Sequence, residues 1–151
     1  MRQTRRPDEP DPSTLTRNWN ELLQELRVVQ TGVQILTGFL VTVPFTQRFP
    51  DLDAADRAIY LTVLCGAVLV TGLVMAPVAY HRVLFRRRQR WWLVEAANVT
   101  ARIGLVLLAL VSAGVVLLVF SVVVSHLAGI VAAGSAIAVI AVLWLVVPSF
   151  R

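Results

Sequence analysis

Four long blocks without charged residues constrain this chain more than any other feature of its sequence. They span residues 28–45, 58–80, 103–124 and 127–147, and none contains Asp, Glu, Lys or Arg. A helix needs about 20 mostly apolar residues to cross the hydrocarbon core of a bilayer. Backbone polar groups in that core must bond within the protein, which favours helices for blocks of this length. The sequence therefore predicts an all-α, polytopic membrane protein with a four-transmembrane-helix bundle.

Composition supports this class. Hydrophobic residues make up 57% of the 151 residues and charged residues 15%, against about 45–50% and 25% in soluble domains. All 14 cations are Arg, which suggests a high-GC bacterial source. The net charge of +5 does not indicate nucleic-acid binding, because five Arg lie within 82–90, directly after an apolar block. Basic residues there orient a membrane protein and contact anionic lipid headgroups.

The distribution of Arg predicts the orientation. The connection at 81–92 carries five Arg and no acid, whereas the connection at 46–57 carries two Arg and three Asp. The positive-inside rule places the first in the cytoplasm and the second outside, so both termini are cytoplasmic. We expect a multi-pass protein of the bacterial cytoplasmic membrane. The residues expected to contact headgroups of the inner leaflet are Arg82, Arg86, Arg87, Arg88, Arg90, Trp91 and Trp92.

The chain divides into a tail and one membrane domain. Residues 1–15 combine three Pro with charges of both signs, which predicts a disordered cytoplasmic tail. Residues 16–151 form the transmembrane domain. Its first helix should run from Thr16 to about Phe45, with an amphipathic cytoplasmic extension before the span and Pro44 near its exit.

Local signals also mark the second and third helices. Asp53 is typical of a helix N-cap, which predicts a helix from about Ala54. A helix from Trp91 to Val124 would be about 50 Å long, longer than the roughly 30 Å hydrocarbon core. Its first part should therefore extend into the cytoplasm.

A polar stripe runs along the first span. The residues that recur at three- or four-residue spacing, and so share one side of the helix, are Arg27, Gln30 or Thr31, Gln34, Thr37 and Gly38. Because Gln is unfavourable in hydrocarbon unless it is hydrogen-bonded, we expect this side to face other helices. Two interpretations stay open: hydrogen bonds that hold helices together, or a hydrophilic pathway.

Ionisable residues gather at the predicted inner boundary. Glu21, Glu25 and Arg27 precede the first span, and Glu95 and Arg102 precede the third. Both helices enter from the same side, so we expect Arg27 or Arg102 to lie near at least one of the Glu residues. The alternatives are a structural ion-pair network and an entry site for a proton or cation.

No catalytic, cofactor or metal site is predicted. His81 and His126 should lie on opposite faces of the membrane, so they cannot share a metal ion, and we interpret them as interfacial residues. The single cysteine, Cys65, lies in an apolar block and suits helix packing. Phosphate-binding glycine loops, zinc patterns and nucleophile elbows are missing from the sequence.

Two strings resemble a known family. ELLQELRVVQTGVQILTGFLVTVPF, followed by RF, and later APVAYHRVLFRR are similar to an uncharacterised bacterial family, of actinobacterial type, of small four-helix membrane proteins. The resemblance covers residues 19–148. Some relatives carry the label sodium:proton antiporter, and the family supplies no established catalytic residues.

The functional expectation is a non-catalytic scaffold, regulator or subunit, and not an enzyme. Ion transport, including proton/sodium antiport, is the alternative, with a pathway through Glu21, Glu25, Arg27, Gln30, Gln34, Glu95 and Arg102. Coupled exchange usually needs a carboxylate within the membrane, and the four apolar blocks contain none. A transporting form would be a homo-oligomer, because four short helices barely enclose a pathway.

Overall fold

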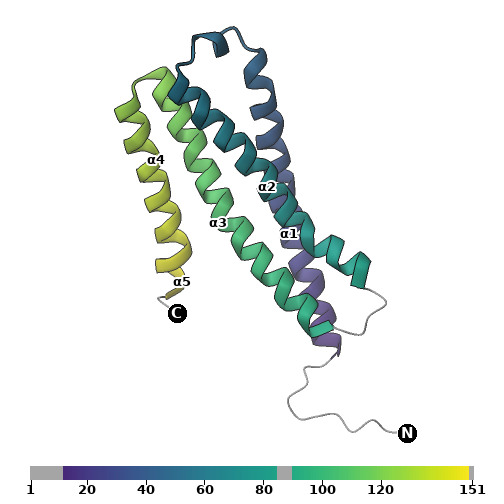
Figure 1. Ribbon diagram of the computed structural model, residues 1–151. Helices are drawn as coiled ribbons and strands as arrows, with labels where there is room; N and C mark the ends of the chain where they lie inside the picture. The colour runs from purple at the N-terminus through teal and green to yellow at the C-terminus, as the bar shows by residue number, and fades with distance from the viewer. Residues whose placement is uncertain (1–11, 85–89, 150–151) are drawn as a thin grey trace, which may run out of the picture.

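The structure, a computed structural model, describes residues 12–84 and 90–149, with side chains described at 21, 24–80 and 96–149. Within these ranges the chain is helical and contains no strand. Both ends of the described chain lie at one end of the molecule (Figure 1). The elements are α1 (Pro12–Thr42), the 3-10 turns η1 (Val43–Phe45) and η2 (Phe49–Asp51), α2 (Ala54–Leu84), α3 (Arg90–Val123), α4 (His126–Ala141), the π-helical turn η3 (Val142–Val146) and α5 (Val147–Ser149).

The predicted number of membrane-length helices is confirmed. The candidate spans are Gln24–Phe45, Ala54–Tyr80, Ala96–Val123 and His126–Ser149, all long and apolar enough to cross a membrane. Each candidate span overlaps one of the four apolar blocks and begins before it, because length and hydropathy are local properties of the sequence.

The first helix starts before its predicted boundary and ends where proline requires. α1 begins at Pro12 rather than Thr16, and it gives way to η1 at Val43. Pro44 has no N–H to donate to the carbonyl of Leu40 four residues earlier. The hydroxyl of Tyr60 on α2 donates to this carbonyl at 3.0 Å. The buried side chain of Tyr60 thus supplies a hydrogen-bond donor to a free carbonyl at the end of α1 and joins α1 to α2.

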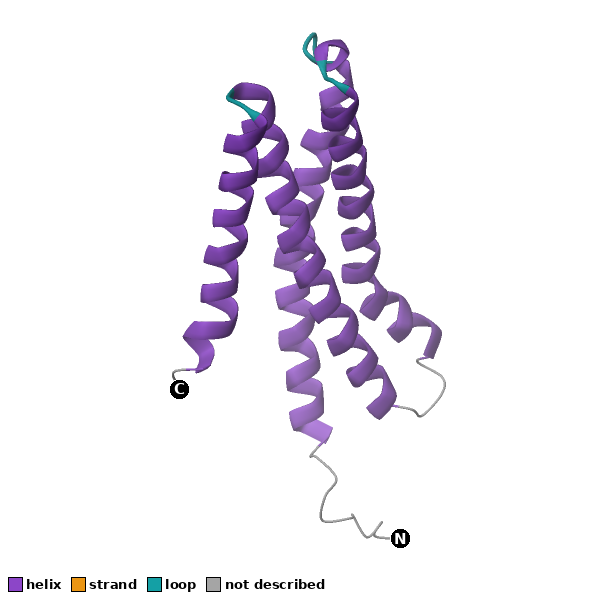
Figure 2. Cartoon of the chain, turned by 60° about the vertical axis from the view of Figure 1, so that its left-hand side comes forward, coloured by secondary structure: helices purple, strands orange, loops and turns teal. Residues whose placement is uncertain are grey.

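The start of α2 is fixed by the predicted cap. The backbone N–H of Asp56 donates to Oδ1 of Asp53 at 2.7 Å, which satisfies one of the unpaired donors of the first turn. Near the other end, buried Pro77 interrupts the helical hydrogen bonds. The last turns of α2 bend away from α3 there (Figures 1 and 2).

The helices form an open array in chain order rather than a closed bundle. α1 packs on α2, α2 on α3, and α3 on α4, while α1 and α3 approach only slightly. Among the described residues, the backbone of α4 does not come close to α1 or α2. Figure 2 shows α4 beside α3 near the turn that connects them and diverging from α3 toward its C-terminal end. The predicted four-helix bundle is therefore more open than that term implies.

The core lies where the first three helices meet. On α1 it uses every seventh residue, Leu26, Val33 and Leu40, which share one face. Glycines allow α2 and α3 to approach closely, since a Cβ at Gly114 would lie 2.5 Å from Cγ2 of Val63. The largest members from α2 and α3 are Tyr60, Val63, Val70, Val74, Val111 and Leu118.

Candidate functional site

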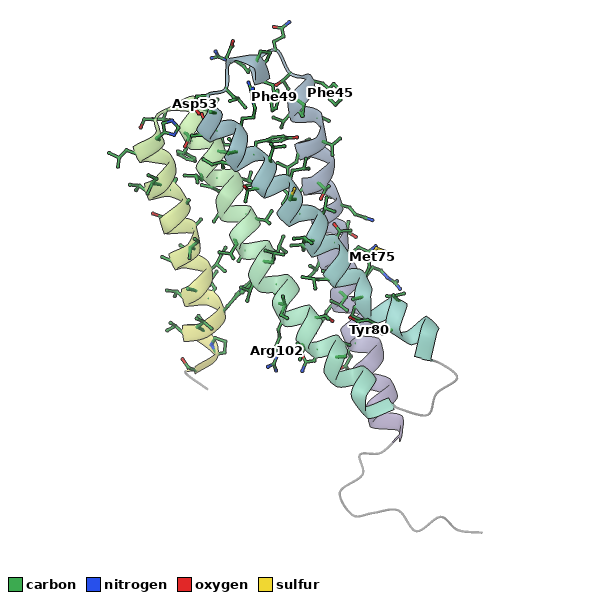
Figure 3. All side chains as sticks on the ribbon, in the orientation of Figure 1. Phe45, Phe49, Asp53, Met75, Tyr80 and Arg102 are labelled. Carbon is green, nitrogen blue, oxygen red and sulfur yellow. The ribbon has the colours of Figure 1, made fainter. Side chains whose placement is uncertain are left out.

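Three ionisable side chains meet at the end of the molecule opposite the termini. Asp53 and Asp56 come from the start of α2, and His126 is the first residue of α4. Nε2 of His126 lies 3.4 Å from Oδ2 of Asp53, and Nδ1 lies 3.7 Å from Oδ1 of Asp56. Figure 3 labels Asp53 at this end, beside the turn that connects α3 to α4. We call these three residues the Asp-Asp-His cluster.

Capping interactions position both sides of the cluster. Asp53 is held as the cap of α2. Ser125 adopts an extended backbone, and its hydroxyl accepts from the N–H of Ala128 at 3.2 Å, so it caps α4. This sharp reversal after α3 directs His126 toward the start of α2.

The two carboxylates have different environments. Asp53 is exposed, and the hydrogen bond from the Asp56 N–H lowers the pKa of its carboxyl, with His126 acting in the same direction. Asp56 is only 7% exposed, and its Oδ1 has no hydrogen-bond partner. A buried carboxylate oxygen without a donor is costly. The neighbour aimed at this oxygen is His126.

Aromatic packing holds the loop that precedes α2. The rings of Phe49 and Tyr60 make an edge-to-face contact with centroids 5.4 Å apart. The guanidinium of Arg57 lies 5.7 Å from the centroid of Phe49. These contacts fix the loop before α2 against the helix that carries Asp56.

The predicted polar stripe of α1 is not turned wholly inward. Gln30 and Thr37 are half-buried, whereas Gln34 is exposed in the single chain. The face containing Leu26, Val33 and Leu40 packs on α2, and Gln34 lies to one side of it. The expectation that the whole stripe faces other helices of this chain is wrong for Gln34. The apolar side chains at heptad spacing decide which face of α1 packs on α2, because they fill the interface between the two helices.

The threonine hydroxyls in the stripe find their hydrogen-bond acceptors within α1 itself. The hydroxyl of Thr31 donates to the carbonyl of Arg27 at 3.0 Å, and that of Thr37 to the carbonyl of Val33 at 2.8 Å. Both bonds stay within α1, so these residues provide no evidence for bonds between helices.

The predicted inner-boundary cluster is only partly described. Glu21, Glu25, Arg27 and Arg102 are exposed, and Arg102 projects outward from α3 (Figure 3). Among the described side chains, neither Arg27 nor Arg102 forms an ion pair with Glu25. The side chain of Glu95 lies outside the described set, so its pairing stays a prediction. The same holds for headgroup contacts of Arg82, Arg86, Arg87, Arg88, Arg90, Trp91 and Trp92.

Sequence reasoning missed the Asp-Asp-His cluster, although a signal was available. The orientation argument placed the connection at 46–57 and the turn at His126 on the same side of the membrane. The prediction that no metal site exists took only the two histidines as possible ligands and did not include the carboxylates on the same predicted side as His126. A search for acids and histidines on one predicted side would have grouped Asp53, Asp56 and His126.

Fold and hydropathy together define a class. Four helices of sufficient length and apolar character are typical of a multi-pass, all-helical membrane protein. The chain belongs to the family of unknown function DUF6328, whose family model matches residues 8–148. This match is consistent with the expectation of an uncharacterised family. Comparison with curated proteins and with solved structures gives no match.

Proposed function

We propose that this chain is a non-catalytic component, a scaffold, regulator or subunit, of the bacterial cytoplasmic membrane. The observation that carries this proposal is the distribution of ionisable groups. The interiors of all four apolar blocks lack Asp, Glu, Lys and Arg. The described charged side chains all lie outside these blocks: at 21–27 on α1, at 102 on α3, and at 48–57 in the loop between α1 and α2 and the first turn of α2. A transporter or an enzyme needs reactive groups at the place where its substrate passes or binds.

The surface of α4 supports a role in assembly. Among its residues only Gly129 and Ala133 are buried, so most of its apolar side chains lie on the outside of the single chain. Lipid covers such a surface well, and helices of a second copy can cover it equally well by close packing. Homo-oligomerisation is part of the proposal.

The proposed orientation has both termini in the cytoplasm. It rests on the Arg-rich sequence at 81–92. The end of α2 and the start of α3 lie toward the end of the molecule where α1 starts and α5 finishes (Figure 1). The Asp-Asp-His cluster would then face outside.

Cysteine labelling tests this orientation. In a Cys65→Ala background, Gln47→Cys should react with a membrane-impermeant maleimide in intact cells, because exposed Gln47 lies in the proposed external loop. Arg88→Cys is the matched control and should react only after the cells are opened. The reverse pattern would invert the topology, and labelling of both sites in intact cells would indicate dual orientation.

Ion transport is the second candidate. It is favoured by the exposure of Glu25 near Gln30 and Gln34 on α1, which leaves a carboxylate accessible at the start of a polar stripe. Since Gln34 is exposed in the single chain, a pathway along this stripe would be completed by a second copy.

A flux measurement separates the two candidates. Purified protein in liposomes should give no proton or sodium flux above that of protein-free liposomes, because the four apolar blocks contain no carboxylate. Flux would overturn the non-catalytic proposal. The combined change Glu21→Gln, Glu25→Gln and Glu95→Gln would then show whether these groups carry the proton, with Asp51→Asn as the control in the opposite loop.

A further inference from the structure

We propose that Asp53, Asp56 and His126 bind one divalent transition-metal ion, with zinc as the representative member of this class. The site requires neither the proposed orientation nor the proposed assembly role. It is built from the start of α2 and the start of α4, which the α3 helix separates in sequence.

The donor atoms have the chemistry and spacing that such an ion requires. One imidazole nitrogen and two carboxylate oxygens lie within 4.8 Å of one another. Ligands bound at about 2.0–2.2 Å in tetrahedral geometry lie roughly 3.3–3.6 Å apart. The 3.7 Å between Nδ1 of His126 and Oδ1 of Asp56 is close to that spacing. The 3.4 Å to Asp53 is measured from the other ring nitrogen, and one imidazole binds a given ion through a single nitrogen. An imidazole favours zinc, cobalt or nickel over magnesium and calcium, which prefer oxygen ligands.

The buried oxygen of Asp56 is an independent indication of a ligand. Its side chain is nine-tenths buried, and Oδ1 has no hydrogen-bond partner. A metal ion between Oδ1 and Nδ1 of His126 would compensate this carboxylate directly. A carboxylate oxygen of Asp53 would be the third ligand, because the ligand atoms of the three residues lie within 4.8 Å of one another.

An ion here would join parts of the fold that otherwise do not pack together. The backbone of α4 approaches α3 but not α2 among the described residues. The side chains of His126 on α4 and Asp56 on α2 nevertheless lie in contact. A bound ion would therefore restrain α4 relative to α2 and stabilise the folded form, because ligand binding favours the state that contains the site.

Zinc titration of the full-length protein in detergent tests the proposal. In a Cys65→Ser background, calorimetry should show one zinc bound per chain and an increased Tm. His126→Gln and Asp56→Asn should each weaken zinc binding by about tenfold or more and abolish the Tm increase. Asp53→Asn retains a capping oxygen and should weaken zinc binding with little change in metal-free Tm. Excess magnesium should not displace zinc.

The matched control is His81→Gln, which removes the only other histidine and should bind zinc like the parent. His126 has a 56% exposed side chain, so His126→Gln should fold even where a change at buried Asp56 does not. Failure of the parent to bind zinc, or unchanged affinity in His126→Gln, would overturn the proposal. Liposome flux and maleimide labelling test the other proposals independently of this result.

Discussion

Tyr60→Ala is expected to lower the free energy of unfolding by about 3 kcal/mol or more, the usual cost of removing a large buried aromatic side chain. Tyr60 is 1% exposed and lies in the core. The substitution removes its ring from Phe49 and leaves a cavity between α1 and α2. Unfolding of the detergent-solubilised protein by a denaturing surfactant, followed by circular dichroism, measures this loss.

Tyr60→Phe is the matched control because it keeps the ring and removes only the hydroxyl. The carbonyl of Leu40 then loses the donor that replaces the missing N–H of Pro44. One hydrogen bond contributes about 1 kcal/mol, so Tyr60→Phe should cost about a third of the loss in Tyr60→Ala. Equal losses in the two variants would assign the stabilisation to the hydroxyl rather than to packing. A loss below that of Tyr60→Phe would contradict the core position of the ring.

Gly129→Ala should separate α4 from α3 and destabilise the protein by about 1–3 kcal/mol, the usual cost of overpacking. A Cβ at Gly129 would lie 2.7 Å from the carbonyl oxygen of Leu117 and would clash with the hydroxyl of Ser121. The clash with backbone cannot be relieved by a side-chain rotation. Because α4 packs on α3 alone among the described helices, the main expected response is movement of α4.

Gly134→Ala provides the comparison on the same helix. A Cβ there meets no atom within 4 Å, and Ala is favoured over Gly in helices by about 1 kcal/mol. This variant should be neutral or slightly more stable. Thermal melts in detergent, together with the rate of disulfide formation between cysteines placed at exposed ends of α3 and α4, measure both effects. Equal behaviour of Gly129→Ala and Gly134→Ala would show that the close approach at Gly129 is unimportant.

The sequence by itself determined the features that depend on neighbouring residues. The four spans were predictable because a bilayer requires long apolar helices, whatever their neighbours. The cap at Asp53 and the end of α1 near Pro44 were predictable because capping and the missing proline N–H act within one turn. The family resemblance also rested on continuous strings, and the family match confirmed its coarse form.

Only the tertiary structure decided which faces of the spans meet. Within an almost uniformly apolar helix, hydrophobic periodicity does not distinguish a packed face from a lipid-facing one. Leu26, Val33 and Leu40 therefore form the contact face of α1, while Gln34, chosen from polarity, does not. The distances within the Asp-Asp-His cluster also needed the structure, although the sequence could have placed its members on one side of the membrane. His126 lies about seventy residues after the two carboxylates, and only the paths of α2 and α3 bring it to them.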